Sequence, residues 1–216
     1  MAPLPLPLRN RLAELILEAF EPGEARATVL ALARTSGADE CAVDAADATR
    51  LALLGWFEPT APGRVRLRRA HRAHGPALAA RAGRAASVVG RWQDRHGEGL
   101  AALLDRTAAL ANHGLFFEVH ELLEPVWFRA AEPQRTALQG LIQVAVAFHH
   151  LENGNREGAR SLLALGVAKL AEAGSVLPLP IRGWLDELRP VLASLVRGEG
   201  SLSAPPWPGP ETGAAT

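Results

Sequence analysis

The chain has 216 residues, 48% of them apolar, and a formal net charge of zero. This length suits one larger domain or two small ones with a buried core, and the composition argues against a disordered protein. The single cysteine, Cys41, excludes an intramolecular disulfide and an all-cysteine metal site. Because no apolar stretch approaches the roughly 18 residues that span a bilayer, we expect a cytoplasmic protein with no membrane partner.

The first third of the chain predicts a small separate unit after a flexible start at residues 1–9. Apolar residues at helical spacing, interrupted by glycine and proline, indicate three helices, and alternating arginine and apolar residues then indicate a β-hairpin. The expected helices and hairpin lie at about 12–19, 25–33, 44–54 and 56–68. Three helices followed by a hairpin is the order of a winged helix-turn-helix. We therefore predict a winged-helix-like unit over residues 10–70.

A basic segment follows this unit. Residues 64–96 hold nine arginines against one acidic residue, Asp94, and residues 71–98 predict a basic linking helix that begins near Pro76. One interpretation is that these arginines pair with acidic segments or face water. The alternative is a nucleic-acid-binding regulator that contacts phosphates through Arg64, Arg66, Arg68, Arg69 and Arg72. The third helix argues against DNA reading, because it begins with Asp44 and Asp47.

From residue 99 onward the pattern is helical almost throughout. The expected helices lie at about 99–112, 115–130, 134–152, 155–173 and 181–197. Short connections of glycine, asparagine and proline separate them, as between antiparallel neighbours, so we predict a mainly α fold with an antiparallel helical bundle over residues 99–197. Residues 198–216 are rich in proline, glycine and alanine and predict a disordered tail. Within this tail we expect Trp207 to be exposed, where it could serve as a linear motif for a partner.

Polar residues interrupt the apolar faces of two successive bundle helices. His120, Glu124 and Trp127 fall at i, i+4 and i+7 of one helix, on the face that also carries Phe116 and Leu123. The next helix places another polar set on one narrow stripe: Gln139, Gln143 and His150. A buried imidazole or carboxylate needs a partner, because desolvating it alone costs several kcal/mol. The two stripes together therefore form the candidate site.

These helices also carry a resemblance. The motifs F-F-E-x-H-E-x-L-E-x-x-W, L-Q-G-L-I-Q-x-A-x-A-x-x-H and G-N-x-x-G-A-x-x-L-L, in that order, resemble the domain of unknown function family 309 over roughly residues 100–175. The resemblance implies a helical bundle and no established activity. The motif positions are Glu118, His120, Glu121, Glu124, Trp127, Gln139, Gly140, Gln143 and His150. Pro125 departs from the family pattern and deletes the N–H that would bond the carbonyl of Glu121.

Several roles remain open for the candidate site. One is a structural hydrogen-bond network that fixes helix register. A second is a divalent metal site in which His120, Glu124 and His150 are ligands, with Gln139 and Gln143 orienting what binds, and this site could support a metal-dependent hydrolase. A third is a metal-free acid/base pair or a small-ligand pocket. Glu118, Glu121 and Trp127 would then lie at the rim or behind the ligands. Assembly into a homo-oligomer is also open.

Overall fold

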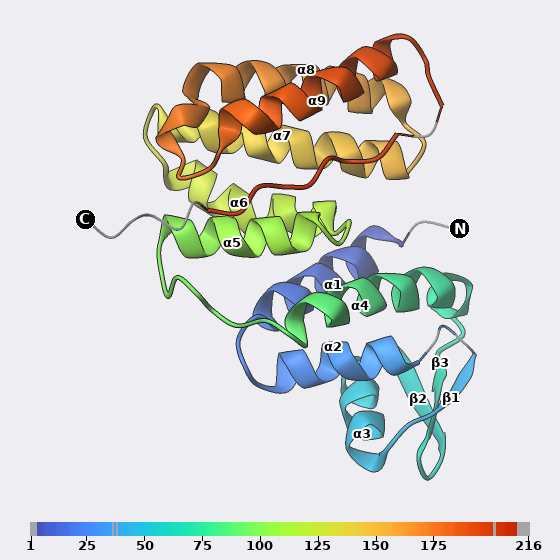
Figure 1. Ribbon diagram of the computed structural model, residues 1–216. Helices are drawn as coiled ribbons and strands as arrows, with labels where there is room; N and C mark the ends of the chain where they lie inside the picture. Colours follow the sequence, from blue (N-terminus) through green and yellow to red (C-terminus); the bar gives the residue numbers. More distant parts are fainter. Residues whose placement is uncertain (1–3, 36, 38, 201, 211–216) are drawn as a thin grey trace. The chain divides into compact units, whose positions relative to one another are not determined.

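A computed structural model describes residues 4–35, 37, 39–200 and 202–210. Helices, short 3₁₀ turns included, make up 65% of these residues, and the sheet has three antiparallel strands. The fold is therefore mainly α, as the sequence predicts. The chain divides between Gln93 and Asp94 into two compact units, called unit 1 and unit 2 below (Figure 1).

Unit 1 combines helices with a small sheet. Its elements are α1 (Leu6–Glu18), α2 (Glu24–Arg34), β1 (Glu40–Ala42), α3 (Ala45–Leu53), β2 (Phe57–Ala61), β3 (Arg64–Leu67), the 3₁₀ turn η1 (Arg72–His74) and α4 (Gly75–Val89). The expected three helices and hairpin are present. The sheet order is β1-β3-β2, so β1 pairs with the hairpin, placing Cys41 opposite Val65. Strand β1 is not evident from the sequence, because three residues are too few to display an alternating pattern.

Two elements of unit 1 differ from the expected boundaries. Helix α1 begins at Leu6, inside the predicted flexible start, because Pro7 in the first helical turn needs no hydrogen-bonded N–H there. Residues 1–3 lie outside the described part. The expected arginine-rich helix ends at Val89, and Gly90 caps it. This helix, α4, packs on α2 within unit 1.

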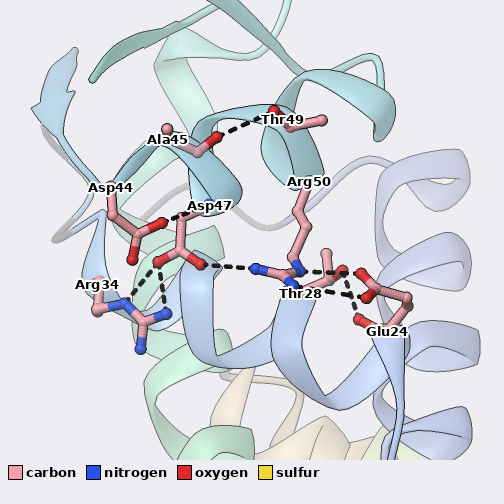
Figure 2. A network of polar contacts seen from close by, with 8 residues as sticks. All are labelled: Glu24, Thr28, Arg34, Asp44, Ala45, Asp47, Thr49 and Arg50. Carbon is pink, nitrogen blue, oxygen red and sulfur yellow. Dashed lines mark hydrogen bonds and ion pairs between the residues drawn. The ribbon is translucent and has the colours of Figure 1, made fainter. Parts of the chain in front are cut away.

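A buried carboxylate joins α2 to α3 (Figure 2). Asp47 is 2% exposed and accepts hydrogen bonds from Arg34 Nε at 2.8 Å and from Arg50 Nη1 at 3.4 Å. Arg50 also donates through Nε to Glu24 Oε2 at 2.9 Å, so α3 is linked to the start of α2 as well. The Asp44 side chain caps α3 by accepting the Asp47 N–H at 2.7 Å. These charge-assisted hydrogen bonds set the position of α3 against α2.

We expect Asp47→Ala to lower the free energy of unfolding of unit 1 by about 2 kcal/mol, because it removes several hydrogen bonds between charged groups. Urea denaturation measures the loss, and hydrogen exchange should locate it in peptides from α2 and α3. Glu14→Ala is the control: Glu14 pairs with Arg11 on the exposed face of α1, and its loss should cost less than about 0.5 kcal/mol. Equal effects of the two changes would contradict the role of Asp47 in holding α3 against α2.

Unit 2 is the predicted antiparallel bundle. Its helices are α5 (Leu100–Ala111), α6 (Phe116–Arg129), α7 (Gln134–Glu152), α8 (Arg156–Ala173), the 3₁₀ turn η2 (Gly174–Val176) and α9 (Ile181–Val196). The boundaries agree closely with the expected ones. Successive helices pack on one another, and the contact between α7 and α8 is the most extensive of the described part (Figure 1).

Two glycines let α7 and α8 approach closely. A Cβ on Gly166 would lie 3.0 Å from the Gly140 carbonyl oxygen and 2.8 Å from Val144 Cγ2, and a Cβ on Gly140 would lie 2.9 Å from Leu170 Cγ. The backbones of the two helices therefore meet without intervening side chains. Gly140, a motif position of the candidate site, is explained by this packing.

We expect Gly166→Ala to destabilise the protein by about 1–3 kcal/mol, because the new methyl group meets backbone atoms of α7 that cannot move independently. Gly183→Ala is the matched control. Gly183 lies in α9, where a Cβ would meet nothing within 4 Å, so its replacement should stabilise the protein by up to about 1 kcal/mol. Thermal unfolding of both variants measures the difference, and two shifts of the same sign would refute the close approach.

The end of the chain differs from the predicted tail. Residues 202–210 run as an extended trace along unit 2 (Figure 1), and Trp207 is 3% exposed. The expectation of an exposed Trp207 is wrong, because this side chain packs on Trp184 of α9 with ring centroids 4.6 Å apart. Burial of an indole offsets the cost of ordering a few residues that prolines already restrict. Residues 201 and 211–216 of the predicted tail lie outside the described part.

Candidate functional site

The imidazole of His120 lies between two carboxylates of its own helix. His120 Nδ1 is 3.0 Å from Glu121 Oε1, and Nε2 is 3.7 Å from Glu124 Oε1. The Phe117 ring stacks beside the imidazole at a centroid distance of 6.2 Å. The three polar side chains are half-exposed, at 27% for His120, 34% for Glu121 and 40% for Glu124. The group, called the α6 cluster below, is therefore open to solvent rather than buried.

Two ring contacts fix how α6 runs against α7. Phe117 lies 5.8 Å from the His149 ring, and the Arg135 guanidinium lies 5.4 Å from the Trp127 ring. The early part of α6 thus meets the end of α7, and the late part of α6 meets its beginning. It follows that the α6 cluster lies level with about residues 140–144 of α7, given the common rise of about 1.5 Å per residue. Gln139 and Gln143 occur at this level.

His150 is too far along α7 to join Glu124. It lies roughly ten residues beyond the level of Glu124, which corresponds to about 15 Å along the helix axis. Its Nδ1 lies 2.9 Å from Asn155 Nδ2, at the turn into α8. In the described part of the chain, no group of three or more His, Cys, Asp or Glu side chains could hold a metal ion. The described structure therefore does not gather His120, Glu124 and His150 into one three-ligand group.

The polar residues of α7 do not form one network with the α6 cluster. No hydrogen bond between described residues joins Gln139, Gln143 or His150 to that cluster. Gln143 Oε1 is buried without a hydrogen-bond partner in the described structure, and so is Trp127 Nε1. A buried acceptor without a donor is uncommon in proteins and often marks a position where water or a ligand binds.

The residues predicted at the rim occupy different environments. Glu118 is completely buried, so it is not at a rim, whereas Glu121 directly contacts His120. Helix α6 continues past the exposed Pro125 to Arg129. Pro125 therefore does not separate Glu121 and Glu124 from His120. Phe117 and Arg135 were not among the predicted site residues. Phe117 could have been found from its i, i+3 spacing to His120, whereas the position of Arg135 over Trp127 depends on tertiary packing.

The basic residues of unit 1 are largely paired. Arg64 lies 3.2 Å from Glu40, Arg66 lies 3.1 Å from Glu58, and Arg72 lies 3.7 Å from Asp39. The hydrogen bond from Arg64 holds the pKa of Glu40 below its usual value. Arg68 Nε donates to the Phe57 carbonyl at 3.4 Å, and Arg69 has no hydrogen bond or ion pair with described residues. The partners come from β1, β2 and the segment before β1, so the basic block is partly neutralised locally.

A comparison with protein families agrees with the motifs. Residues 104–162 match the model of a family described as a domain of unknown function (DUF309). The resemblance is confirmed over this segment, which runs from α5 into α8 and contains the α6 cluster and both glutamines. Searches of curated proteins and of solved structures find no match. No helix of the described part is long and apolar enough to cross a membrane.

We expect Gln143→Met to raise the melting temperature, because it replaces a buried acceptor that lacks a partner with a side chain of similar shape that needs none. The gain should be about 1 kcal/mol, the lower end of the cost of an unsatisfied buried polar group. Gln139→Met, one helical turn away on a half-buried side chain, should change the unfolding free energy by less than about 0.5 kcal/mol. A destabilised Gln143→Met would show that Oε1 has a hydrogen-bond donor in solution.

Proposed function

We propose that unit 2 binds a small, positively charged molecule that donates hydrogen bonds, an amine or a guanidinium compound, between the α6 cluster and the level of Gln143 on α7. The observation that carries this proposal is a surplus of acceptors. Two half-exposed carboxylates stand on either side of His120, and a third acceptor, Gln143 Oε1, is buried without a donor.

The chemistry of the α6 cluster suits this class of ligand. An ammonium or guanidinium group makes charge-assisted hydrogen bonds to carboxylates, which are stronger than those between neutral groups. The Gln143 amide oxygen would accept a further N–H from a ligand that reaches between the helices.

The alternatives receive less support. A metal-dependent hydrolase would need His150 beside His120 and Glu124. His150 lies instead near the end of α7, next to Asn155. A nucleic-acid-binding regulator would need free cations on the hairpin and on the turn that follows it, but Arg64 and Arg66 of β3 and Arg72 of η1 face carboxylates. An acid/base role for His120 would itself require a bound substrate, so binding of a polar molecule is the property to test first.

We expect putrescine or agmatine to bind the wild-type protein at low ionic strength and raise its melting temperature, because a ligand that binds only the folded state stabilises it. Glu124→Gln should weaken binding by about tenfold, equivalent to about 1.4 kcal/mol. Gln143→Met should weaken it while leaving the free protein at least as stable as the wild type. Isothermal titration calorimetry at two salt concentrations measures these affinities.

Glu172→Gln is the matched control, because Glu172 is an exposed carboxylate of α8 and its replacement changes the net charge equally. Its affinity for the amine should match that of the wild type. If Glu172→Gln and Glu124→Gln weaken binding to the same extent, the amine responds only to net charge and the proposed site is wrong. Failure of every amine and guanidinium probe to bind would also refute the proposal.

A further inference from the structure

A single side chain anchors the final described segment, residues 202–210, to unit 2. Trp207 is 3% exposed, and its ring packs on Trp184 of α9 at 4.6 Å between centroids. The residues on either side, from Leu202 to Pro206 and from Pro208 to Pro210, are half-exposed or exposed. A buried aromatic anchor with solvent-exposed neighbours is how short linear peptides bind to protein surfaces.

The backbone at the anchor is held by one asparagine. Asn112, which caps the end of α5, accepts the Trp207 N–H on Oδ1 at 2.7 Å and donates from Nδ2 to the Trp207 carbonyl at 3.0 Å. This amide therefore pairs with both backbone groups of one residue, as a neighbouring strand would. Trp184 and Asn112 together form a surface, called the Trp184–Asn112 site below, that recognises an indole and the peptide unit that carries it.

The contact is also incomplete. The indole Nε1 atoms of Trp184 and Trp207 are both buried, and neither has a hydrogen-bond partner in the described structure. Each N–H loses its water on docking and gains no acceptor, which opposes the apolar contact between the rings. Beyond the Asn112 pairing, the backbone of residues 202–210 forms no hydrogen bond with the described residues. The segment is thus ordered by few interactions, which favours reversible docking.

We propose that the Trp184–Asn112 site is a receptor for a proline-flanked tryptophan peptide, and that residues 202–210 occupy it as a displaceable intramolecular ligand. The partner is a protein segment with tryptophan between prolines, as in the chain's own Pro206-Trp207-Pro208. Prolines restrict the free peptide and so reduce the entropy lost on binding. The segment in the same chain competes at high effective concentration, so a partner gains access only when that segment leaves.

The test uses the full-length protein and a fluorescent peptide with the sequence of residues 202–210. Trp207→Ala should vacate the site, so this variant should bind the peptide at least about tenfold more tightly than the wild type, whose site is occupied. A peptide with alanine in place of its tryptophan should not bind. In the Trp207→Ala background, Asn112→Ala should abolish binding, whereas Asn153→Ala, which changes the matching cap residue of α7, should not. Fluorescence anisotropy measures each affinity, and circular dichroism establishes that each variant is folded.

Several results would overturn the proposal. Equal peptide binding by wild type and Trp207→Ala, or no binding by folded Trp207→Ala, would show that the site accepts no peptide in trans. An unfolded Trp207→Ala protein would show that the segment is an integral part of the core. A wild-type dimer that Trp207→Ala abolishes would support the proposal and would identify a second copy of this chain as the partner.

Discussion

The close approach of α7 and α8 is the constraint on which unit 2 depends. Gly140 and Gly166 bring two backbones together, and a methyl group on either would meet atoms of the opposite helix. Helix α7 is thereby fixed on one side, and α6 packs against it through the contacts of Phe117 and Trp127. The level of the α6 cluster relative to Gln143 follows from this packing. A site built from side chains of two helices keeps its geometry only if neither helix slides along the other.

The helix boundaries could be predicted because the signals that end helices are local. Gly114, Pro133 and the segment before Asn155 each interrupt a periodic pattern, and each lies at a boundary between successive helices. The position of His150 could not be predicted in the same way. Its place on the correct stripe of α7 was evident from spacing, but its height relative to Glu124 depends on how the two helices are aligned, which helical periodicity does not specify. For Trp207, composition indicated only flexibility, whereas its side chain packs on Trp184 and its backbone pairs with Asn112, 95 residues earlier.

The charges of unit 1 also show that tertiary contacts do not follow from local sequence. Residues 1–60 contain nine acidic residues against five arginines, and residues 64–96 contain nine arginines against one acid. The fold brings members of these two blocks together, as in the contacts of Arg64 with Glu40 and Arg72 with Asp39. Asp47 lies on α3, the helix that a DNA-binding winged helix would use for reading. Its network occupies Arg50 of the same helix and Arg34 at the end of α2 (Figure 2). A cationic stretch of sequence therefore does not become an equally cationic surface, because the antiparallel strands place acidic and basic residues opposite each other.

Both proposed binding surfaces of unit 2 contain buried polar atoms whose hydrogen-bonding capacity is unused in the described structure: Gln143 Oε1 in one, and the indole nitrogens of Trp184 and Trp207 in the other. Their chemistry differs, since the amide oxygen needs a donor and the indoles need acceptors. An apolar residue at position 143 would spare the fold that cost, and the proposed ligand would supply the missing donor. The same argument does not extend to the indoles, because their rings pack on each other whether or not the nitrogens have hydrogen-bond partners. At the Trp184–Asn112 site, the unsatisfied nitrogens lower the affinity for residues 202–210, because they lower the stability of the docked state. The segment is therefore easier to displace.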